Sequence, residues 1–517
     1  MYHNQDIMMS HPSHLHIEKA VLLVSAAFAV VLLFIISPDS YTHDLYGRHD
    51  SAWFFMCGKA WMEGLTPYVD FADSKGPLLW LIYGLGYLIS PTNYIGVFWL
   101  SCIWYAIIFY ITYLTARIFL PGRRNALICT LLMALAYFNP MFHYETRAED
   151  WCMLFMIASL YLTSKMLYGD EQSEKGIHLS FFLLGVCFAA LVLIKYNIAA
   201  MQSVFILYAG YHAIRRHHSF VLPFLWLLAG LLITFTPFIL YLIAQGSFHA
   251  FIQEYFVNAY ITAFFDEGLR EDYLYDWVAM LTNPLRLPFF LILVVGGILF
   301  SFKTKKYRLF PLITTLFIFA ITVTHSYWDY YFNSCAICCI WPIIWLTKVA
   351  PTISSRPVIT AMGVVVALTV CQLAIDRYFK HNLFWNDGQE REEFYNYEYY
   401  ISQIPQPTII NASFHEEGHG ILSRALPGTK YWAKQNGSSA QMNMEHINGI
   451  LSRKASFIIM YQKADNLIEE DFIHHAGYPY HYAGYLLSKK QLSKPAKPIH
   501  VSNWEVFTKQ MPEALRR

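Results

Sequence analysis

Charged residues are scarce in this chain of 517 residues. Lysine, arginine, aspartate and glutamate make up 14% of it, against about 25% in a typical soluble domain. The formal net charge is only +1, so no overall positive field indicates a nucleic-acid partner. Hydrophobic residues reach 56%. The composition therefore excludes an ordinary soluble domain and favours a membrane protein.

Several well-known motifs are missing too. The chain has no G-x-x-x-x-G-K-[ST] loop and no H-E-x-x-H, which argues against an ATP-driven pump and a zincin-type protease. The absence of D-x-D disfavours a metal-bound nucleotide-sugar site. A C-x-x-C-C run spans Cys335 to Cys339. It suits a metal site in principle, but its apolar neighbours favour small packing residues. We therefore expect no metal site and no cofactor.

Long apolar runs dominate what remains, and about 20 apolar residues suffice to cross a bilayer as a helix. The sequence thus predicts an α-helical polytopic membrane protein with about 11 to 13 transmembrane helices. Residues 77–90 are too few for a full span, so we expect a broken or re-entrant helix there, buried by its neighbours. The expected spans lie near 20–37, 94–118, 124–139, 151–168, 179–194, 196–212, 220–245, 286–302, 308–324, 332–347 and 357–375.

Basic residues set the expected orientation. They gather in three short loops, at LPGRR, IRRHH and FKTKKYR, and such loops usually face the cytoplasm. The loops at 38–77, 140–150, 246–285 and 325–331 then lie on the outer side, which gathers the polar residues on one face of the membrane.

Three parts of the chain follow from this pattern. Residues 1–18 read as a cytoplasmic tail, either disordered or metal-binding through its histidines. Residues 19–376 form the transmembrane domain, beginning with an uncleaved anchor because no clear cleavage site follows the first run. Residues 377–517 are polar and predict a small α/β domain on the outer side, in which PTIINAS and ASFIIMY are short buried strands.

The first outer loop carries acids and bases together. Asp50 begins an amphipathic stretch that ends at Gly64 and suits a helix lying in the membrane interface. Asp50 is either a plain N-cap or a general base aimed at a hydroxyl acceptor. Further along the loop, Lys75 precedes Pro77 at the membrane edge. Lys75 either extends to the interface or holds a lipid-linked phosphate.

Two further clusters lie at the expected outer edge. One holds His143, Glu145, Arg147, Glu149 and Asp150, and so many charges at a bilayer surface are costly unless paired and functional. We expect Arg147 to pair with Glu149 or Asp150, and either acid to orient the acceptor or support Asp50. The other cluster reads as an aromatic belt or as a site where sugars stack, and its members are His325, Tyr327, Tyr330 and Tyr331.

These motifs together resemble the GT-C superfamily of integral-membrane glycosyltransferases. The similarity is greatest to the bacterial branch related to protein O-mannosyltransferases and the lipid A aminoarabinose transferase. Its signs are the early acid, a G-x-x-P-Y-x-D stretch with Tyr68 and Asp70, the K-G-P at Lys75 to Pro77, the R-x-E at Arg147, and the late H-x-Y-x-x-Y-Y. The resemblance covers roughly residues 20–375. Many relatives have K-P-P where this chain has K-G-P, and an acid pair where it has His49 and Asp50.

The resemblance implies transfer of a sugar from a polyprenyl-phosphate donor to a hydroxyl of a glycan, lipid or protein on the outer face of a bacterial inner membrane. Asp50 matches the family's catalytic acid, and Lys75 matches the residue near the lipid phosphate. Displacement by a base opposite the leaving phosphate would invert the anomeric centre. Glu149, Asp150 and His143 remain alternative bases.

Two other functions stay open. A transporter or flippase for a lipid-linked glycan would bury charges at mid-membrane and show paired, interrupted helices, and neither is evident. A ligase acting on a diphosphate-linked glycan would need an arginine-rich outer loop, yet residues 246–285 contain only Arg270.

Overall fold

The computed structural model describes most of the first 350 residues and parts of the C-terminal region. The described residues are 12–46, 49–138, 145–169, 173–217, 220–258, 309–325, 329–349, 389–412, 418–433, 440–452, 454–459, 480–482 and 486–488.

Helices form the larger part of the described residues, and six stretches among them are long and apolar enough to cross a membrane. The polytopic helical fold class is therefore confirmed. The expected spans at 286–302 and 357–375 lie outside the described residues, so the count of 11 to 13 helices stays a prediction. The bundle comprises α1 (Pro12–Ile36), α4 (Ile95–Phe119), α5 (Arg123–Tyr137), α6 (Ala148–Tyr168), α7 (Glu174–Ile194), α8 (Tyr196–His217), α9 (Val221–Ala244), α15 (Leu309–His325), the 3₁₀ segment η5 (Asp329–Cys339) and α16 (Ile340–Val349).

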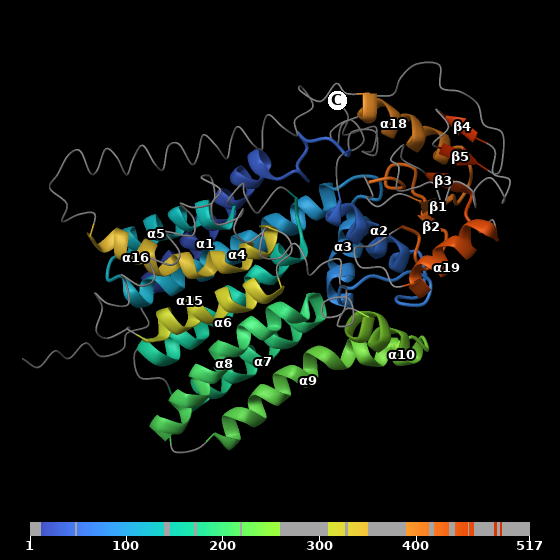
Figure 1. Cartoon of the computed structure of the whole chain (residues 1–517). Coiled ribbons are helices and arrows are strands. Elements are labelled where there is room, and N and C mark those ends of the chain that lie inside the picture. The colour runs from blue at the N-terminus through green and yellow to red at the C-terminus, as the bar shows by residue number, and fades with distance from the viewer. Residues whose placement is uncertain are drawn as a thin grey trace, which may run out of the picture.

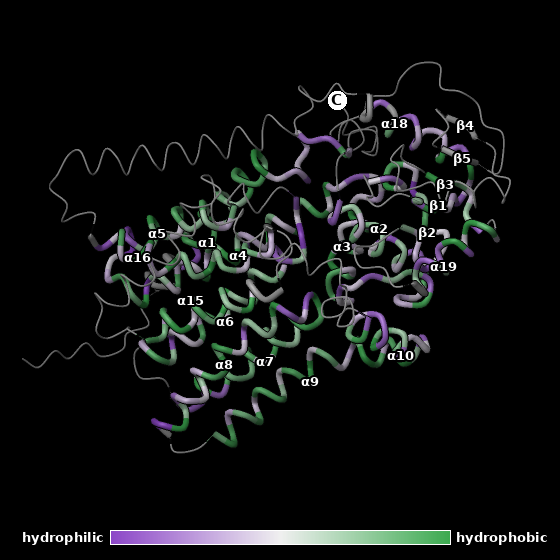
Figure 2. The backbone as a smooth tube through the Cα atoms, in the orientation of Figure 1, coloured by the Kyte–Doolittle hydropathy of each residue, from purple (hydrophilic) through white to green (hydrophobic). Residues whose placement is uncertain are grey.

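The bundle has one end that carries the polar contacts. Figure 1 shows α2, α3 and the small sheet gathered beyond this end, and Figure 2 shows that the bundle itself is mainly apolar. Hydrogen bonds between helix ends mark this polar end of the bundle. Thr146, just before α6, donates to Asp39 just after α1. Tyr255, after α9, donates to Val192 near the end of α7. The basic loop at Arg123, which joins α4 to α5, lies at the other end of α4.

Helix α3 (Pro77–Ile89) is the short helix expected at this position. At about 1.5 Å per residue, its 13 residues span roughly 20 Å, well short of a hydrocarbon core of about 30 Å. Pro77 suits its first turn, where a missing N–H costs nothing. Trp80 and Tyr83 are fully buried, so α3 is a buried short helix, while its re-entrant path stays a prediction.

Helix α2 (Asp50–Met62) corrects the expected interfacial helix. Residues 51–60 are all buried, so Trp53, Phe54 and Met56 pack inside the protein rather than against lipid. Gly58 permits close packing against α3, since a Cβ there would lie 2.4 Å from the backbone nitrogen of Gly84. The helix ends at Met62, just before the expected Gly64, whose φ of 92° only glycine adopts readily.

The C-terminal region contains a five-stranded sheet in the order β2-β1-β3-β5-β4. The two expected strands are present as β1 (Thr408–Asn411) and β3 (Phe457–Ile459), and they pair in parallel. Strand β5 pairs antiparallel with both β3 and β4. The remaining elements are α18 (Gln389–Ser402), β2 (Leu426–Pro427), α19 (Ala440–Leu451), β4 (Tyr480–Tyr482) and β5 (Leu486–Ser488). The boundary at residue 377 falls outside the described residues.

Candidate functional site

Asp50 occupies the first residue of α2, one position later than the expected N-cap. The N-cap is His49, which makes no side-chain capping bond. Glu145, from the loop before α6, does the capping instead. Its Oε2 accepts from the backbone nitrogens of His49 at 3.1 Å and Ser51 at 3.2 Å, and from the Ser51 hydroxyl at 3.0 Å. A distant carboxylate thus satisfies the free N–H groups that begin every helix and holds Asp50 in place.

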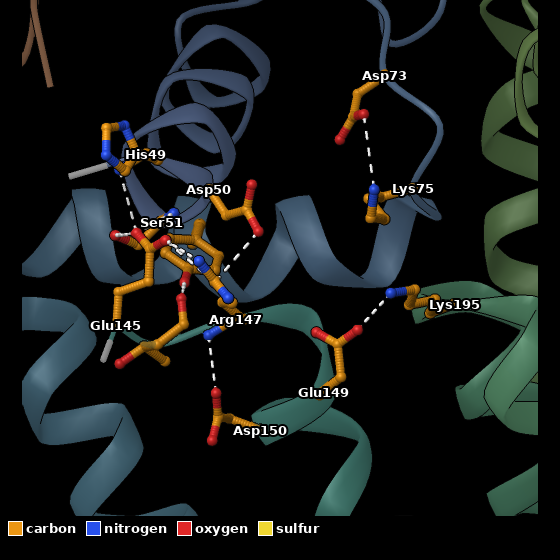
Figure 3. Close-up of polar contacts among 12 residues, drawn as sticks. His49, Asp50, Ser51, Asp73, Lys75, Glu145, Arg147, Glu149, Asp150 and Lys195 are labelled. Carbon is orange, nitrogen blue, oxygen red and sulfur yellow. Dashed lines mark hydrogen bonds and ion pairs between the residues drawn. The ribbon is translucent and has the colours of Figure 1, made fainter. Parts of the chain in front are cut away.

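Arg147 lies at the centre of the site, as Figure 3 shows. Its Nε is 3.2 Å from Asp50 Oδ2, and its Nε and Nη2 donate to Glu145 Oε1 at 3.0 and 2.9 Å. The guanidinium also lies 3.7 Å from the ring centre of Tyr330, a cation–π contact. The expected side-chain pairing of Arg147 with Glu149 or Asp150 is therefore wrong, because the backbone turns Arg147 toward α2.

Electrostatics separate the two acids that share Arg147. Burial would by itself raise the pKa of Glu145, but Arg147, His49 and the Ser51 N–H outweigh burial and lower it to about 2. The pKa of Asp50 is raised instead, first by burial and then by the charge of Glu145, against the opposing effect of Arg147. The Asp50 side chain keeps 38% of its surface exposed. It is the more basic and the more accessible of the pair, as a general base requires.

Glu149 pairs with Lys195, a residue between α7 and α8. Both side chains are at least nine-tenths buried, so each charge depends on the other, and removing either would leave a buried charge uncompensated. The Lys195 ammonium also lies 3.9 Å from the ring centre of Tyr331. No motif in the sequence around Lys195 marks it as a site residue; the contact with Glu149, 46 positions away, identifies it.

Asp150 holds neighbouring helices together rather than facing the site. Its Oδ2 accepts from the Arg147 N–H at 2.9 Å, which closes the first turn of α6. Its Oδ1 accepts from the Tyr105 hydroxyl at 2.8 Å and from Asn333 at 3.3 Å. These bonds occupy both oxygens, so Asp150 is placed to hold α6 against α4 and η5.

Lys75 faces the same cluster from the loop before α3. Its Nζ is 4.0 Å from Asp73 and 3.1 Å from the Ser74 hydroxyl. Burial opposes its charged form, but the charges of Asp73, Asp50 and Glu149 raise the pKa of Lys75. Lys75 therefore carries a permanent positive charge that is only loosely paired among the described residues.

Gly76 explains the K-G-P variation. Its N–H donates to Ile194 O at 3.1 Å, and a Cβ would lie 2.1 Å from Leu193 O. A proline cannot donate that bond. The backbone at Gly76 thus lies directly against the end of α7, which brings Lys75 toward Lys195.

Tyr68 and Asp70 shape this loop. Tyr68 is fully buried, has a φ of 66° and donates to Lys75 O at 2.9 Å. Asp70 is exposed and accepts from Thr66 N at 2.7 Å, closing a turn. Both contacts favour a positioning role over contact with substrate. His143 and Tyr327 lie outside the described residues, and only the helical backbone of His325 is described.

Comparison with known proteins adds to this geometry. The family model of dolichyl-phosphate-mannose-protein mannosyltransferases matches residues 74–241. ArnT from Cupriavidus metallidurans in the apo state aligns with a TM-score of 0.55 at 11% identity, over 93% of this chain and 98% of that one. ArnT bound to undecaprenyl phosphate aligns with a TM-score of 0.53 at 11% identity, over 92% and 98%.

A third structure has the same architecture. The Archaeoglobus fulgidus oligosaccharyltransferase tethered with an acceptor peptide aligns with a TM-score of 0.50 at 11% identity, over 93% of this chain and 74% of that one. No curated protein matches the chain by sequence comparison. The chain has the GT-C glycosyltransferase fold. The resemblance inferred from the first-loop motifs is confirmed at this level.

Within the GT-C fold, the described site contains two chemically distinct sides. Asp50 supplies an accessible carboxylate on α2, while Lys75 and Lys195 supply positive charge near Tyr331. Such an arrangement can accept a proton on one side and stabilise a departing anion on the other. Among the described residues no group of three or more metal-ligating side chains gathers.

Proposed function

We propose that this protein transfers a sugar from a polyprenyl-phosphate donor to a hydroxyl acceptor. The acceptor belongs to a glycan, lipid or protein on the outer face of the membrane. Asp50 is the general base, and Lys75 binds the donor phosphate. The GT-C fold and the mannosyltransferase family match over residues 74–241 support this class of reaction.

The single observation that carries the proposal is the state of Asp50. Its carboxylate is fixed at one oxygen by Arg147 yet stays 38% exposed, and its pKa is raised by burial. A base for a sugar-acceptor hydroxyl needs this combination of a fixed orientation, access and increased basicity. Glu149 and Asp150 lack it, because Lys195 engages the first and three donors engage the second.

The donor phosphate would meet Lys75. A compact ammonium binds phosphate as a point charge, and its 4.0 Å separation from Asp73 is long for an ion pair. Lys195, beside Tyr331, lies on the same side and adds charge there. With the base and the phosphate on opposite faces of the sugar ring, in-line displacement inverts the anomeric centre.

The polar end of the bundle would face the periplasm of a bacterial cell. Arg123 at the start of α5 and Arg215 in the last turn of α8 lie at the other end of the bundle, and basic residues at helix ends favour the cytoplasm. The C-terminal sheet then lies on the periplasmic side of the inner membrane, beside α2.

The test is transfer by the purified protein in lipid, with a panel of polyprenyl-phosphate sugars and with wild type beside Asp50→Asn. We expect turnover with one donor, loss of turnover in Asp50→Asn and unchanged donor binding. Glu174→Gln serves as the control, since Glu174 is an exposed acid in the first turn of α7 and takes no part in the site. Equal turnover in wild type and Asp50→Asn would contradict the base assignment. Movement of an intact lipid-linked glycan without transfer would favour the flippase instead.

A further inference from the structure

Residues 430–433 connect the C-terminal sheet to the outer loops. They follow β2 and are anchored to β1, because Asn411 N donates to Trp432 O at 2.6 Å and Asn411 forms a bridge with Ala433. The segment therefore moves with the sheet, and its other groups face the remainder of the protein.

Its first contact is with α2. The indole of Trp432 stacks on that of Trp53, with ring centres 4.7 Å apart and an interplanar angle of 28°. Trp432 is fully buried and Trp53 is 9% exposed. Trp53 lies one helical turn after Asp50, and residues three apart share a helix face. The stack therefore fixes the turn that carries the Asp50 carboxylate.

Its second contact is with the loop that carries Lys75. The Ala72 N–H donates to Lys430 O at 3.2 Å. Ala72 immediately precedes Asp73, the carboxylate that faces Lys75 at 4.0 Å. The backbone carbonyl of Lys430 thus holds the start of the loop that carries Asp73 and Lys75.

Its third contact is with the π-helical segment η1 (Ile252–Asn258). Lys430 Nζ and the Tyr431 hydroxyl both donate to Glu254 Oε1, at 2.6 and 2.7 Å. Glu254 is 5% exposed. The next residue, Tyr255, accepts from Tyr196 N at 3.0 Å, directly after Lys195. The segment is thereby linked to all three parts of the site.

We propose that residues 430–433 are a positioning element that sets the Asp50 carboxylate relative to Lys75. This inference rests on the proposed function, and it assigns the C-terminal sheet a part in the transfer step itself. The reaction needs the base and the phosphate side held at a fixed separation across the sugar. The segment contacts both α2 and the loop that carries Lys75, so its backbone and the Trp432 ring maintain that separation.

The experiment compares Trp432→Leu, Trp432→Phe and Ile410→Ala in the full-length protein. Ile410 is fully buried in β1 and does not belong to the apolar cluster that includes Trp53 and Trp432, so its variant perturbs the sheet alone. We expect Trp432→Leu to lower kcat about 100-fold, a typical cost of misplacing reacting groups by about 1 Å, with KM for the donor nearly unchanged. Trp432→Phe keeps a ring on Trp53 and should restore most of kcat.

Amide hydrogen exchange over residues 50–62 and 66–76 provides a readout that does not need activity. Trp432→Leu should speed exchange in both stretches, while Ile410→Ala should leave them at the wild-type rate. Equal exchange and equal kcat in Trp432→Leu and Ile410→Ala would overturn the positioning role. A wild type inactive toward every donor would count against the proposed function, and the exchange rates would still decide the positioning role.

Discussion

At the residue scale, the site depends on one arginine shared by two unequal acids. Glu145 receives two Arg147 bonds and three more at the start of α2, whereas Asp50 meets Arg147 through one oxygen. This inequality leaves Glu145 as a fixed anion and Asp50 as the titratable group.

The raised pKa of Asp50 predicts the acid side of the pH profile. A base works only when deprotonated, so transfer should fall as pH drops through the pKa of Asp50. That midpoint should lie above 3.8, the ordinary value for an aspartate. The measurement is kcat against pH with a saturating donor. A rate that stays flat down to the ordinary value would contradict the assignment.

Removing the charge of Glu145 should destabilise the protein. Glu145→Gln leaves Arg147 with Asp50 as its carboxylate partner among the described residues, and breaking a buried ion pair typically costs about 3–5 kcal/mol. The folded pKa of about 2 lies below the ordinary 4.5. The stabilisation is therefore fully present above pH 4.5 and is lost as pH falls toward 2.

Thermal unfolding in detergent checks this prediction. The midpoint of Glu145→Gln should lie below that of wild type at neutral pH, and the gap should narrow on acidification. Glu174→Gln is the control, since Glu174 is an exposed acid in the first turn of α7. A gap that widens in acid would exclude this account.

At the scale of elements, the site is assembled from helix ends. The starts of α2 and α6, the loop before α3 and the junction of α7 with α8 all contribute charged groups. Figure 3 shows these groups converging from separate ribbons. Short backbone approaches such as that at Gly76 decide how near they come.

Gly76→Ala should therefore impair both stability and donor binding. The added Cβ would lie 2.1 Å from Leu193 O, and overpacking of this kind typically costs about 1–3 kcal/mol. Displacement of the loop would move Lys75, so KM for the donor should rise. Gly64→Ala gives a comparison, because a Cβ there meets nothing within 4 Å and only its φ is unfavourable. Equal donor KM in both variants would refute the link to Lys75.

At the scale of the whole molecule, the described residues divide into an apolar bundle and a more polar end, as Figure 2 shows. The eight described cysteines are all buried, so an introduced surface cysteine should be the main target among the described residues for a membrane-impermeant maleimide.

The orientation can be tested with two such cysteines. Met444→Cys, on α19 where Met444 is 59% exposed, should be labelled from the periplasmic side in intact cells. Arg124→Cys, at the exposed start of α5, should be labelled only after the cells are opened. Labelling of both positions from the same side would contradict the predicted topology.

The sequence by itself determined the membrane class, most of the described spans, the short helix at Pro77 and the strands β1 and β3. These features depend on local apolar runs, and a run of suitable length needs few tertiary contacts to be recognised. It also marked the residues around Asp50, Lys75 and Arg147, because charge at a membrane edge is costly unless it has a use.

Only the tertiary structure decided which charges meet. The pairing of Arg147 with Glu145 and Asp50, that of Glu149 with Lys195, and the burial of α2 beneath Trp432 join residues between 2 and about 380 positions apart. Several partners lay equally near in sequence, and the backbone directions at the helix ends selected among them. The local sequence shows where charged residues occur, but the packing of the helices decides which opposite charge each of them meets.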